Sequence, residues 1–252
     1  MRRWWRTCLV TLAERDGPER KRSRMTHPFH AITPFTLLDF PDRSACILWV
    51  AGCNMRCGYC HNPEIVLGKG ELSEGDALAF LRRRQGLLEG VVLSGGEATT
   101  WPGLGDFAAQ VKAMGFAVKL DTNGLRPDVV AQMLDRMLID HVALDYKAPP
   151  ERFRAVTGTV AFPRFARTLD LLCRQDRVTF EVRTTVHDAL LDEGDVLAIA
   201  TDLERRGYRG RLAVQQAVVE PDRPLLGSLT PPGRKLDRQW LAAQTSLALD
   251  FR

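Results

Sequence analysis

Three of the six cysteines lie within eight residues and form the strongest chemical signal in the sequence. Cys53, Cys57 and Cys60 are separated by three and then two residues, a spacing that lets one loop wrap a compact iron–sulfur cluster. Gly52 and Gly58 relieve the backbone where it must turn around the metal. Three thiolates on a four-iron cube leave one iron without a cysteine, and an open metal position can chelate a substrate. The spacing therefore predicts a [4Fe–4S] cluster that binds a ligand.

Two other kinds of site use cysteines at similar spacing. A structural zinc ion could take the three thiols with His61 as fourth ligand, although zinc ligands usually come as two separated pairs and no second pair follows. A redox pair at Cys57 and Cys60 would leave Cys53 unexplained. We expect the remaining cysteines to be small buried apolar residues: Cys8, Cys46 and Cys173.

The elements that must position this loop alternate along the chain between short β-branched runs and longer amphipathic stretches. Strands are predicted at 45–50, 90–93, 117–120, 141–144, 178–186 and 211–214. Helices are predicted between them at 73–85, 107–114, 127–137, 163–174 and 193–206. Six strands joined by helices imply right-handed crossovers and a parallel sheet. The fold class is therefore α/β, as a partial barrel or an open doubly wound sheet, with ligands at the carboxyl ends of the strands.

A Gly-Gly-Glu sequence ends the second predicted strand, downstream of the cysteine loop. Gly95 and Gly96 allow a close backbone approach to a ligand, and the carboxylate of Glu97 complements a cation. Alone, such a sequence is more often a turn than a site. Its place at a strand end, on the same edge as the cysteines, favours ligand binding.

Two pairs of polar residues end the next two predicted strands. Asp121 and Asn123 share one face of their strand, as do Asp145 and Lys147, because side chains alternate with a period of two. Each pair could therefore point into the barrel together. The alternative is an exposed Asp–Lys pair, which would have little energetic weight.

Together, the cysteine loop and the three strand-end motifs resemble the radical S-adenosylmethionine superfamily over about residues 30–216. The resemblance implies a partial (β/α)6 TIM-like barrel of the radical SAM type, with a [4Fe–4S] cluster and S-adenosylmethionine as cofactors. It implies that the three cysteines ligate the cluster and that the Gly-Gly-Glu motif holds the methionine ammonium group. Tyr59 is similar to the aromatic residue that lies against adenine in the family. The resemblance also implies contacts to the ribose, the carboxylate or a nearby cation from Asp121, Asn123, Asp145 and Lys147.

The segments 32–43, 59–64 and 214–216 resemble more narrowly the activating proteins of anaerobic ribonucleoside-triphosphate reductases. In such glycyl-radical-enzyme activases, a reduced cluster cleaves S-adenosylmethionine, and a 5′-deoxyadenosyl radical takes a hydrogen atom from a glycine of the partner. The resemblance implies an anaerobic ribonucleotide reductase as partner and a flavodoxin or ferredoxin-type electron donor. Two alternatives stay open, a radical enzyme that acts on a small molecule and a non-catalytic iron–sulfur or zinc protein.

Charge divides the chain into two unequal parts. The formal net charge is +4, but residues 1–24 carry eight basic and three acidic side chains, so the rest of the chain carries −1. A nearly neutral body lacks the basic face of a nucleic-acid binder, so we expect no nucleic-acid partner. We predict a disordered, basic extension at 1–24 and a single radical SAM domain with a short C-terminal tail at 25–252. The rival interpretation is a docking arm for an acidic partner or a membrane surface, formed by Arg2, Arg3, Trp4, Trp5 and Arg6.

Composition also bears on the compartment. Hydrophobic residues make up 45% of the chain and charged residues 26%, and no apolar run approaches the roughly 18 residues that a membrane span needs. The apolar stretch near the N-terminus is too short for a signal peptide. Three of the cysteines are clustered and the other three are scattered along the chain. This distribution fits a metal site in a reducing compartment better than a disulfide framework. We therefore expect a cytoplasmic protein without a membrane partner.

Overall fold

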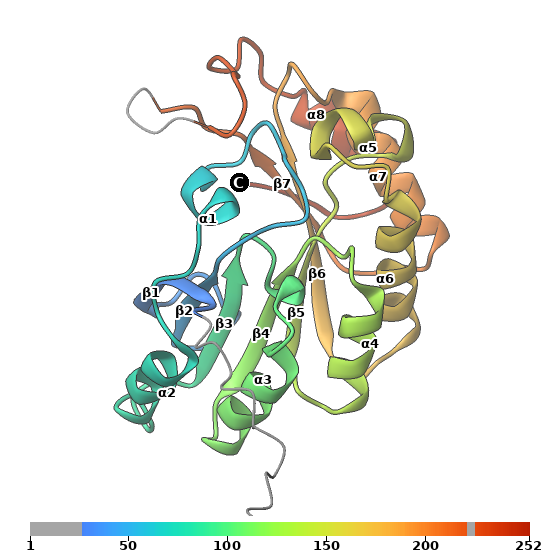
Figure 1. The fold of residues 1–252 in the computed structure, drawn as a ribbon. Coiled ribbons are helices and arrows are strands. Elements are labelled where there is room, and N and C mark those ends of the chain that lie inside the picture. The colour runs from blue at the N-terminus through green and yellow to red at the C-terminus, as the bar shows by residue number, and fades with distance from the viewer. Residues whose placement is uncertain (1–26, 221–224) are drawn as a thin grey trace, which may run out of the picture.

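The computed structural model describes residues 27–220 and 225–252, which fold around one curved eight-stranded sheet (Figure 1). The strands follow one another across the sheet in chain order: β1 (Phe29–Thr36), β2 (Ala45–Val50), β3 (Gly90–Gly95), β4 (Ala117–Thr122), β5 (His141–Asp145), β6 (Thr179–Val186), β7 (Leu212–Gln216) and β8 (Leu249–Phe251). β1 pairs antiparallel with β2, and all later neighbours pair in parallel. The predicted extension at 1–24 lies outside the described residues.

Helices connect the parallel strands, and the longer ones cover the outer face of the sheet (Figure 1). They are α1 (Pro63–Leu67), α2 (Glu74–Arg82), the 3-10 helix η1 (Ala98–Thr100), α3 (Leu104–Ala113), α4 (Pro127–Asp135), α5 (Pro150–Thr157), α6 (Phe162–Arg174), α7 (Glu193–Arg205) and α8 (Arg238–Gln244). The six predicted strands are β2 to β7, and the predicted α/β partial barrel is confirmed. Among the described residues, β1 and β8 each have one strand neighbour, so the barrel is an open arc.

The sequence did not predict the two edge strands or the short helices. β1 contains Pro34, which cannot donate to a strand ladder and lies where the register with β2 shifts between Thr33 and Thr36. β8 is only three residues long, and α1 only five. Such short elements leave too few residues for a periodic pattern.

Side-chain alternation along the strands separates the core from the site. Leu93, Leu120 and Leu144 are fully buried in the main hydrophobic cluster. Neighbouring positions such as Asp121 and Asp145 lie on the opposite face of the sheet, inside the arc. Helix packing therefore fixes the strands from outside, while the inner face is left for polar chemistry.

Local sequence signals hold the helices in place. Ser73 caps α2 and forms a capping box with Asp76. Asp192 and Asp195 form a second capping box at the start of α7.

In residues 27–220 and 225–252, no helix is both long and apolar enough to cross a membrane.

Candidate active site

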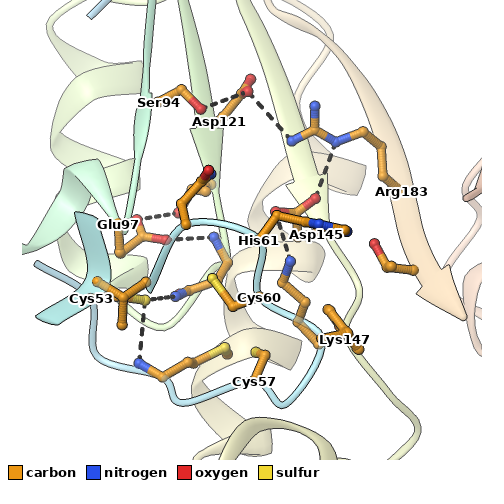
Figure 2. A pocket seen from close by; sticks show the side chains of 18 residues that line it. Cys53, Cys57, Cys60, His61, Ser94, Glu97, Asp121, Asp145, Lys147 and Arg183 are labelled. Atoms are coloured by element: carbon orange, nitrogen blue, oxygen red, sulfur yellow. Dashed lines mark hydrogen bonds and ion pairs between the residues drawn. The ribbon is translucent and has the colours of Figure 1, made fainter. Parts of the chain in front are cut away.

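The cysteine loop starts directly after β2 and is held by backbone hydrogen bonds. Gly52 has a φ of +86° and donates from its amide to the carbonyl of Ile65 at 2.8 Å. The amide of Cys60 donates to the carbonyl of Cys57 at 3.0 Å, which closes a tight turn between these two cysteines. The guanidinium of Arg56 donates to the carbonyl of Cys53 at 2.8 Å. The loop is therefore shaped by its own backbone, with its cysteines lining one pocket (Figure 2).

A segment near the C-terminus, residues 225–233, lies against this loop, and we call it the C-terminal strap. The amide of Leu226 donates to the carbonyl of Cys60 at 3.0 Å, and the amide of Gly227 donates to that of Gly58 at 2.9 Å. Further along the strap, His187 from the loop after β6 contacts the carbonyl of Thr230 at 2.8 Å. The strap thus pairs with the cysteine loop and is tied to the end of β6.

Burial controls the state of two of the thiols. Burial raises the pKa of Cys53 to about 12 and the pKa of Cys57 to about 11. The amide of Met55 donates to the sulfur of Cys53 at 3.4 Å and opposes the rise in the pKa of that thiol. Both are protonated at neutral pH before metal arrives, so metal binding must displace protons.

No three His, Cys, Asp or Glu side chains in the described part of the chain are placed to hold a single metal ion.

The Gly-Gly-Glu turn is fitted tightly against the start of the cysteine loop. Gly95 has a φ of +124°, and a Cβ there would lie 2.3 Å from the carbonyl oxygen of Val50. A Cβ on Gly96 would lie 2.1 Å from the carbonyl oxygen of Gly52. The amide of Glu97 donates to that same carbonyl at 2.9 Å. Both glycines are required here because the two turns approach within backbone contact.

The carboxylate of Glu97 is buried and surrounded by donors from its own chain. Thr99 donates from its amide and its hydroxyl, Thr122 donates from its hydroxyl at 2.7 Å, and the amide of Asn123 donates at 2.6 Å. Burial is the largest influence on this group and raises its pKa, while these hydrogen bonds oppose the rise. Glu97 therefore ties the Gly-Gly-Glu turn to the end of β4.

Charged side chains on the inner face of β4, β5 and β6 alternate in sign. The ammonium of Lys119 lies 3.1 Å from one oxygen of Asp121, and Nη2 of Arg183 lies 3.5 Å from the other. Nε of Arg183 donates to Asp145 at 3.1 Å, and Lys147 donates to the second oxygen of Asp145 at 3.1 Å. The result is a continuous ladder of opposite charges that runs toward the cysteine loop (Figure 2).

The ladder sets the charge state of its members nearest the cysteines. Burial alone would raise the pKa of Asp145, but the charges of Arg183 and Lys147 outweigh it and lower the pKa below its ordinary value. Burial alone would lower the pKa of Lys147, but Asp145, Tyr59 and Cys57 raise it well above its ordinary value. Both groups are therefore charged at neutral pH.

Tyr59 lies between the cysteines and the ladder. Its ring is almost fully buried, and Nζ of Lys147 lies 5.8 Å from the ring centroid, within the range of a cation–π contact. Its hydroxyl is buried and has no hydrogen-bond partner among the described residues. A buried hydroxyl without a partner is costly, which indicates that the pocket is completed by a bound group.

The structure brings ten of the eleven predicted site residues to the wall of this pocket: Cys53, Cys57, Tyr59, Cys60, Gly96, Glu97, Asp121, Asn123, Asp145 and Lys147. Gly95 is not on the wall and instead supplies the turn that places Gly96. The pocket has about 790 Å³ of empty space, counting its mouth open to solvent.

Sequence reasoning missed several residues of the same wall: Met55, Asn62, Val66, Ser94, Thr122, Arg183 and Thr185. His61, considered above only as a zinc ligand, also lines it. A signal for Arg183 and Thr185 was present, because alternation places them on one face of β6. Their meaning depends on neighbouring strands, which a single strand does not reveal.

The residues present fit an iron–sulfur cluster with an organic cofactor. Three thiols from one loop provide the sulfur ligands that such clusters take and leave one iron for another ligand. Beside them, the glycine at 96 opens the wall, and charges of both signs could meet an amino acid and a ribose. Cys46 and Cys173 lie away from this wall. Cys46 is fully buried, as expected, whereas Cys173 is only partly buried because it lies near the end of α6, and Cys8 lies outside the described residues.

An α/β partial barrel with a three-cysteine loop at the carboxyl edge of its strands defines a class of iron–sulfur enzymes that bind a small cofactor. The profile of the Radical SAM superfamily matches residues 47–200, which cover the cysteine loop and the strands through β6. The chain belongs to the radical SAM superfamily. It is an enzyme, and its cofactors are a [4Fe–4S] cluster and S-adenosylmethionine.

Two curated relatives match part of this chain. A protein of Methanocaldococcus jannaschii with the provisional name glycyl-radical enzyme activating enzyme is 31% identical over 177 residues, 67% of this chain and 72% of its own. The pyruvate formate-lyase-activating enzyme of Clostridium pasteurianum is 31% identical over 137 residues, 51% of this chain and 56% of its own, so the match spans little more than half of that relative.

Solved structures show the same fold at low identity. The crystal structure of QueE from Escherichia coli has a TM-score of 0.52 at 17% identity, covering 91% of this chain and 95% of its own. Streptococcus suis SuiB bound to S-adenosylmethionine has a TM-score of 0.60 at 12% identity, covering 80% of this chain and 48% of its own. Both support the partial-barrel fold.

Proposed function

We propose that this chain activates a glycyl-radical enzyme and that its partner is an anaerobic ribonucleotide reductase. One observation carries the proposal: the chain shares 31% identity over 177 residues with a relative named as a glycyl-radical enzyme activating enzyme. The pocket supports the proposal as well, because it is lined by the three cysteines and by the charged residues at the strand ends. The choice of reductase rests on the resemblance of segments 32–43, 59–64 and 214–216 to its activating proteins.

The proposed reaction balances as a one-electron step. The [4Fe–4S] cluster, reduced by a flavodoxin or ferredoxin-type donor, would supply one electron to break the bond between sulfur and the 5′ carbon of S-adenosylmethionine, with methionine as the leaving group. A hydrogen atom from a glycine Cα of the partner would then pass to the adenosyl 5′ carbon, so that the products would be 5′-deoxyadenosine and a glycyl radical on the partner. The cofactor supplies the radical chemistry, and the protein supplies binding and orientation.

In this proposal, the residues of the pocket hold and shield the reactants. Cys53, Cys57 and Cys60 hold the cluster. The turn at Gly96 and the side chain of Glu97 would hold the methionine end of the cofactor. The remaining wall residues orient the ribose, the carboxylate and the adenine: Tyr59, Asp121, Asn123, Asp145 and Lys147.

Electron paramagnetic resonance tests the partner directly. Reconstituted protein, dithionite, S-adenosylmethionine and an anaerobic ribonucleotide reductase from the same source should give a glycyl-radical signal, which a Cys53→Ala variant should not produce. A reductase with its radical glycine changed to alanine is the matched control. Cleavage of S-adenosylmethionine without a glycine-dependent signal would reject the reductase as partner.

A small-molecule substrate is the second candidate. It is favoured by the 27% identity over 154 residues, 61% of this chain, to a protein of Neisseria meningitidis named 7-carboxy-7-deazaguanine synthase. A purine-derived precursor would then replace the partner glycine as hydrogen donor. Faster release of 5′-deoxyadenosine with such precursors than with any glycyl-radical enzyme would favour this alternative.

A further inference from the structure

Arg183 bridges two carboxylates that belong to different strands. It lies on β6, its register partner Asp145 ends β5, and Asp121 lies one strand further on β4. Its guanidinium reaches both, with Nε 3.1 Å from Asp145 and Nη2 3.5 Å from Asp121. Its side chain is only 17% exposed and lines the pocket, where Figure 2 shows it between the two aspartates.

The bridge separates two like charges inside the pocket. Lys119 and Lys147 neutralise Asp121 and Asp145 from the outer ends of the ladder, so Arg183 is the cation that lies between the two carboxylates. Without it, the carboxylates would share a partly buried wall with no positive charge between them, and each would reorient or recruit another cation. A planar guanidinium can meet two carboxylates at once, whereas a lysine ammonium is a single point charge.

We propose that Arg183 is a positioning residue for S-adenosylmethionine. Its guanidinium holds Asp121 and Asp145 in fixed orientation, and the positive charge between the two carboxylates is therefore a side chain of the protein and not a bound ion. The inference deepens the proposed function and rests on the cofactor, but it does not depend on the partner. Arg183 acts through the two aspartates, which face the cofactor from the pocket wall.

Equilibrium dialysis of S-adenosylmethionine against anaerobically reconstituted protein tests the inference without any partner enzyme. Arg183→Gln should raise the Kd about 10- to 150-fold, the usual effect of losing a charge-assisted contact, while iron and sulfide content stays unchanged. Arg183→Lys should recover only part of the affinity, because it reaches one carboxylate. Added guanidinium ion should lower the Kd of Arg183→Ala, and the same concentration of sodium should not.

Arg206 provides a matched control on the outer side of the molecule. It also bridges two carboxylates, Asp170 on α6 and Asp202 on α7, but it does not line the pocket. Arg206→Gln should leave the Kd within about twofold of wild type, and guanidinium should have no effect on the affinity of Arg206→Ala.

Each outcome decides between the hypotheses. An unchanged Kd in folded Arg183→Gln, or equal guanidinium effects at both arginines, overturns the positioning role. If Arg183→Gln does not fold, Arg183→Lys decides, and a Kd within twofold of wild type overturns the role. If the wild-type protein binds no S-adenosylmethionine, the cofactor assignment fails and this inference with it. A normal result here with no glycyl radical on the reductase would reject only the proposed partner.

Discussion

The cysteine side chains show how one residue type takes different roles according to its surroundings. Cys53 and Cys57 have pKa values raised by burial, yet they line an open pocket where metal can displace their protons. Cys46 also has its pKa raised by burial, to about 12, but it lies inside β2 in the hydrophobic core. Access to the pocket, and not the pKa of the thiol, therefore separates the proposed ligands from the structural cysteine.

Replacing each loop cysteine by alanine should abolish cluster assembly. A four-iron cluster held by three thiolates loses a third of its protein ligands in each variant. Iron and sulfide analysis after anaerobic reconstitution measures the result, with about four irons per chain expected for the wild type. Cys173→Ala is the control and should assemble normally, whereas retention of four irons after all three loop cysteines are changed would refute the assignment.

Glu97 should contribute to folding as well as to cofactor binding. In Glu97→Gln, an amide group would replace a carboxylate oxygen among donors from Thr99, Thr122 and Asn123, so donors would face each other. We expect the free energy of unfolding to fall by about 1–3 kcal/mol in urea titrations. An unfolding midpoint equal to that of wild type would show that the carboxylate does not pin the turn to β4.

At the scale of elements, the site is built where backbone segments meet. The turn after β3 contacts the loop after β2, and the C-terminal strap contacts that loop from another direction. These contacts involve backbone groups, so they depend on residue size more than on side-chain chemistry. Local predictions of strands and helices therefore gave the positions of the site residues but not the packing of the loops.

The strap should stabilise the cysteine loop through Gly227. A Cβ at this position would lie 2.8 Å from both Cα and the carbonyl oxygen of Gly58, so Gly227→Ala must displace the strap or the loop. We expect Gly227→Ala to lose its cluster in air faster than the wild type does. The decrease in the visible absorbance of the cluster measures this loss. Gly233→Ala is the matched control in the same strap, since its Cβ would meet nothing closer than a side-chain oxygen at 3.5 Å. Equal rates in the two variants would contradict the role of the strap.

At the scale of the whole molecule, helices pack on the outer face of one curved sheet (Figure 1). The polar side chains of the pocket lie on its inner face and at the ends of its strands. The sheet runs in chain order from β1 to β8, and the pocket lies at the carboxyl edge of its parallel strands. The sheet carries the strand-end part of the pocket wall, so the ends of β3, β4, β5 and β6 are positioned together. The cysteine loop and α1 carry the rest of the wall. The segment 1–24 is the part of the chain for which we propose no role in this arrangement.

Deleting residues 1–24 should leave iron content, S-adenosylmethionine cleavage and thermal stability unchanged. The segment combines a dense run of basic residues with few aromatics beyond Trp4 and Trp5, a composition that does not offset the entropy of ordering. Calorimetry and a cleavage assay on the shortened protein measure the outcome. A loss of more than about 1 kcal/mol in stability would show that the segment packs on the barrel.

The sequence by itself determined the fold class and most of the candidate site. The three cysteines, the Gly-Gly-Glu turn and the polar pairs at the ends of β4 and β5 could all be located. Spacing along one loop and period-two alternation along one strand are local properties of the sequence. Parallel strands then had to bring their carboxyl ends to one edge. Ten of the eleven residues chosen in this way line the same pocket.

Only the tertiary structure decided how these residues are held. Arg183 on β6 meets Asp121 on β4 across the intervening strand β5, and the strap near the C-terminus meets a cysteine loop that lies in the first third of the chain. Two of the residues that donate to Glu97, Thr122 and Asn123, become its neighbours only when β3 and β4 pair. Such contacts depend on the register and curvature of the complete sheet. The residues next to each partner in the sequence carry no information about the distance between the two partners in the fold.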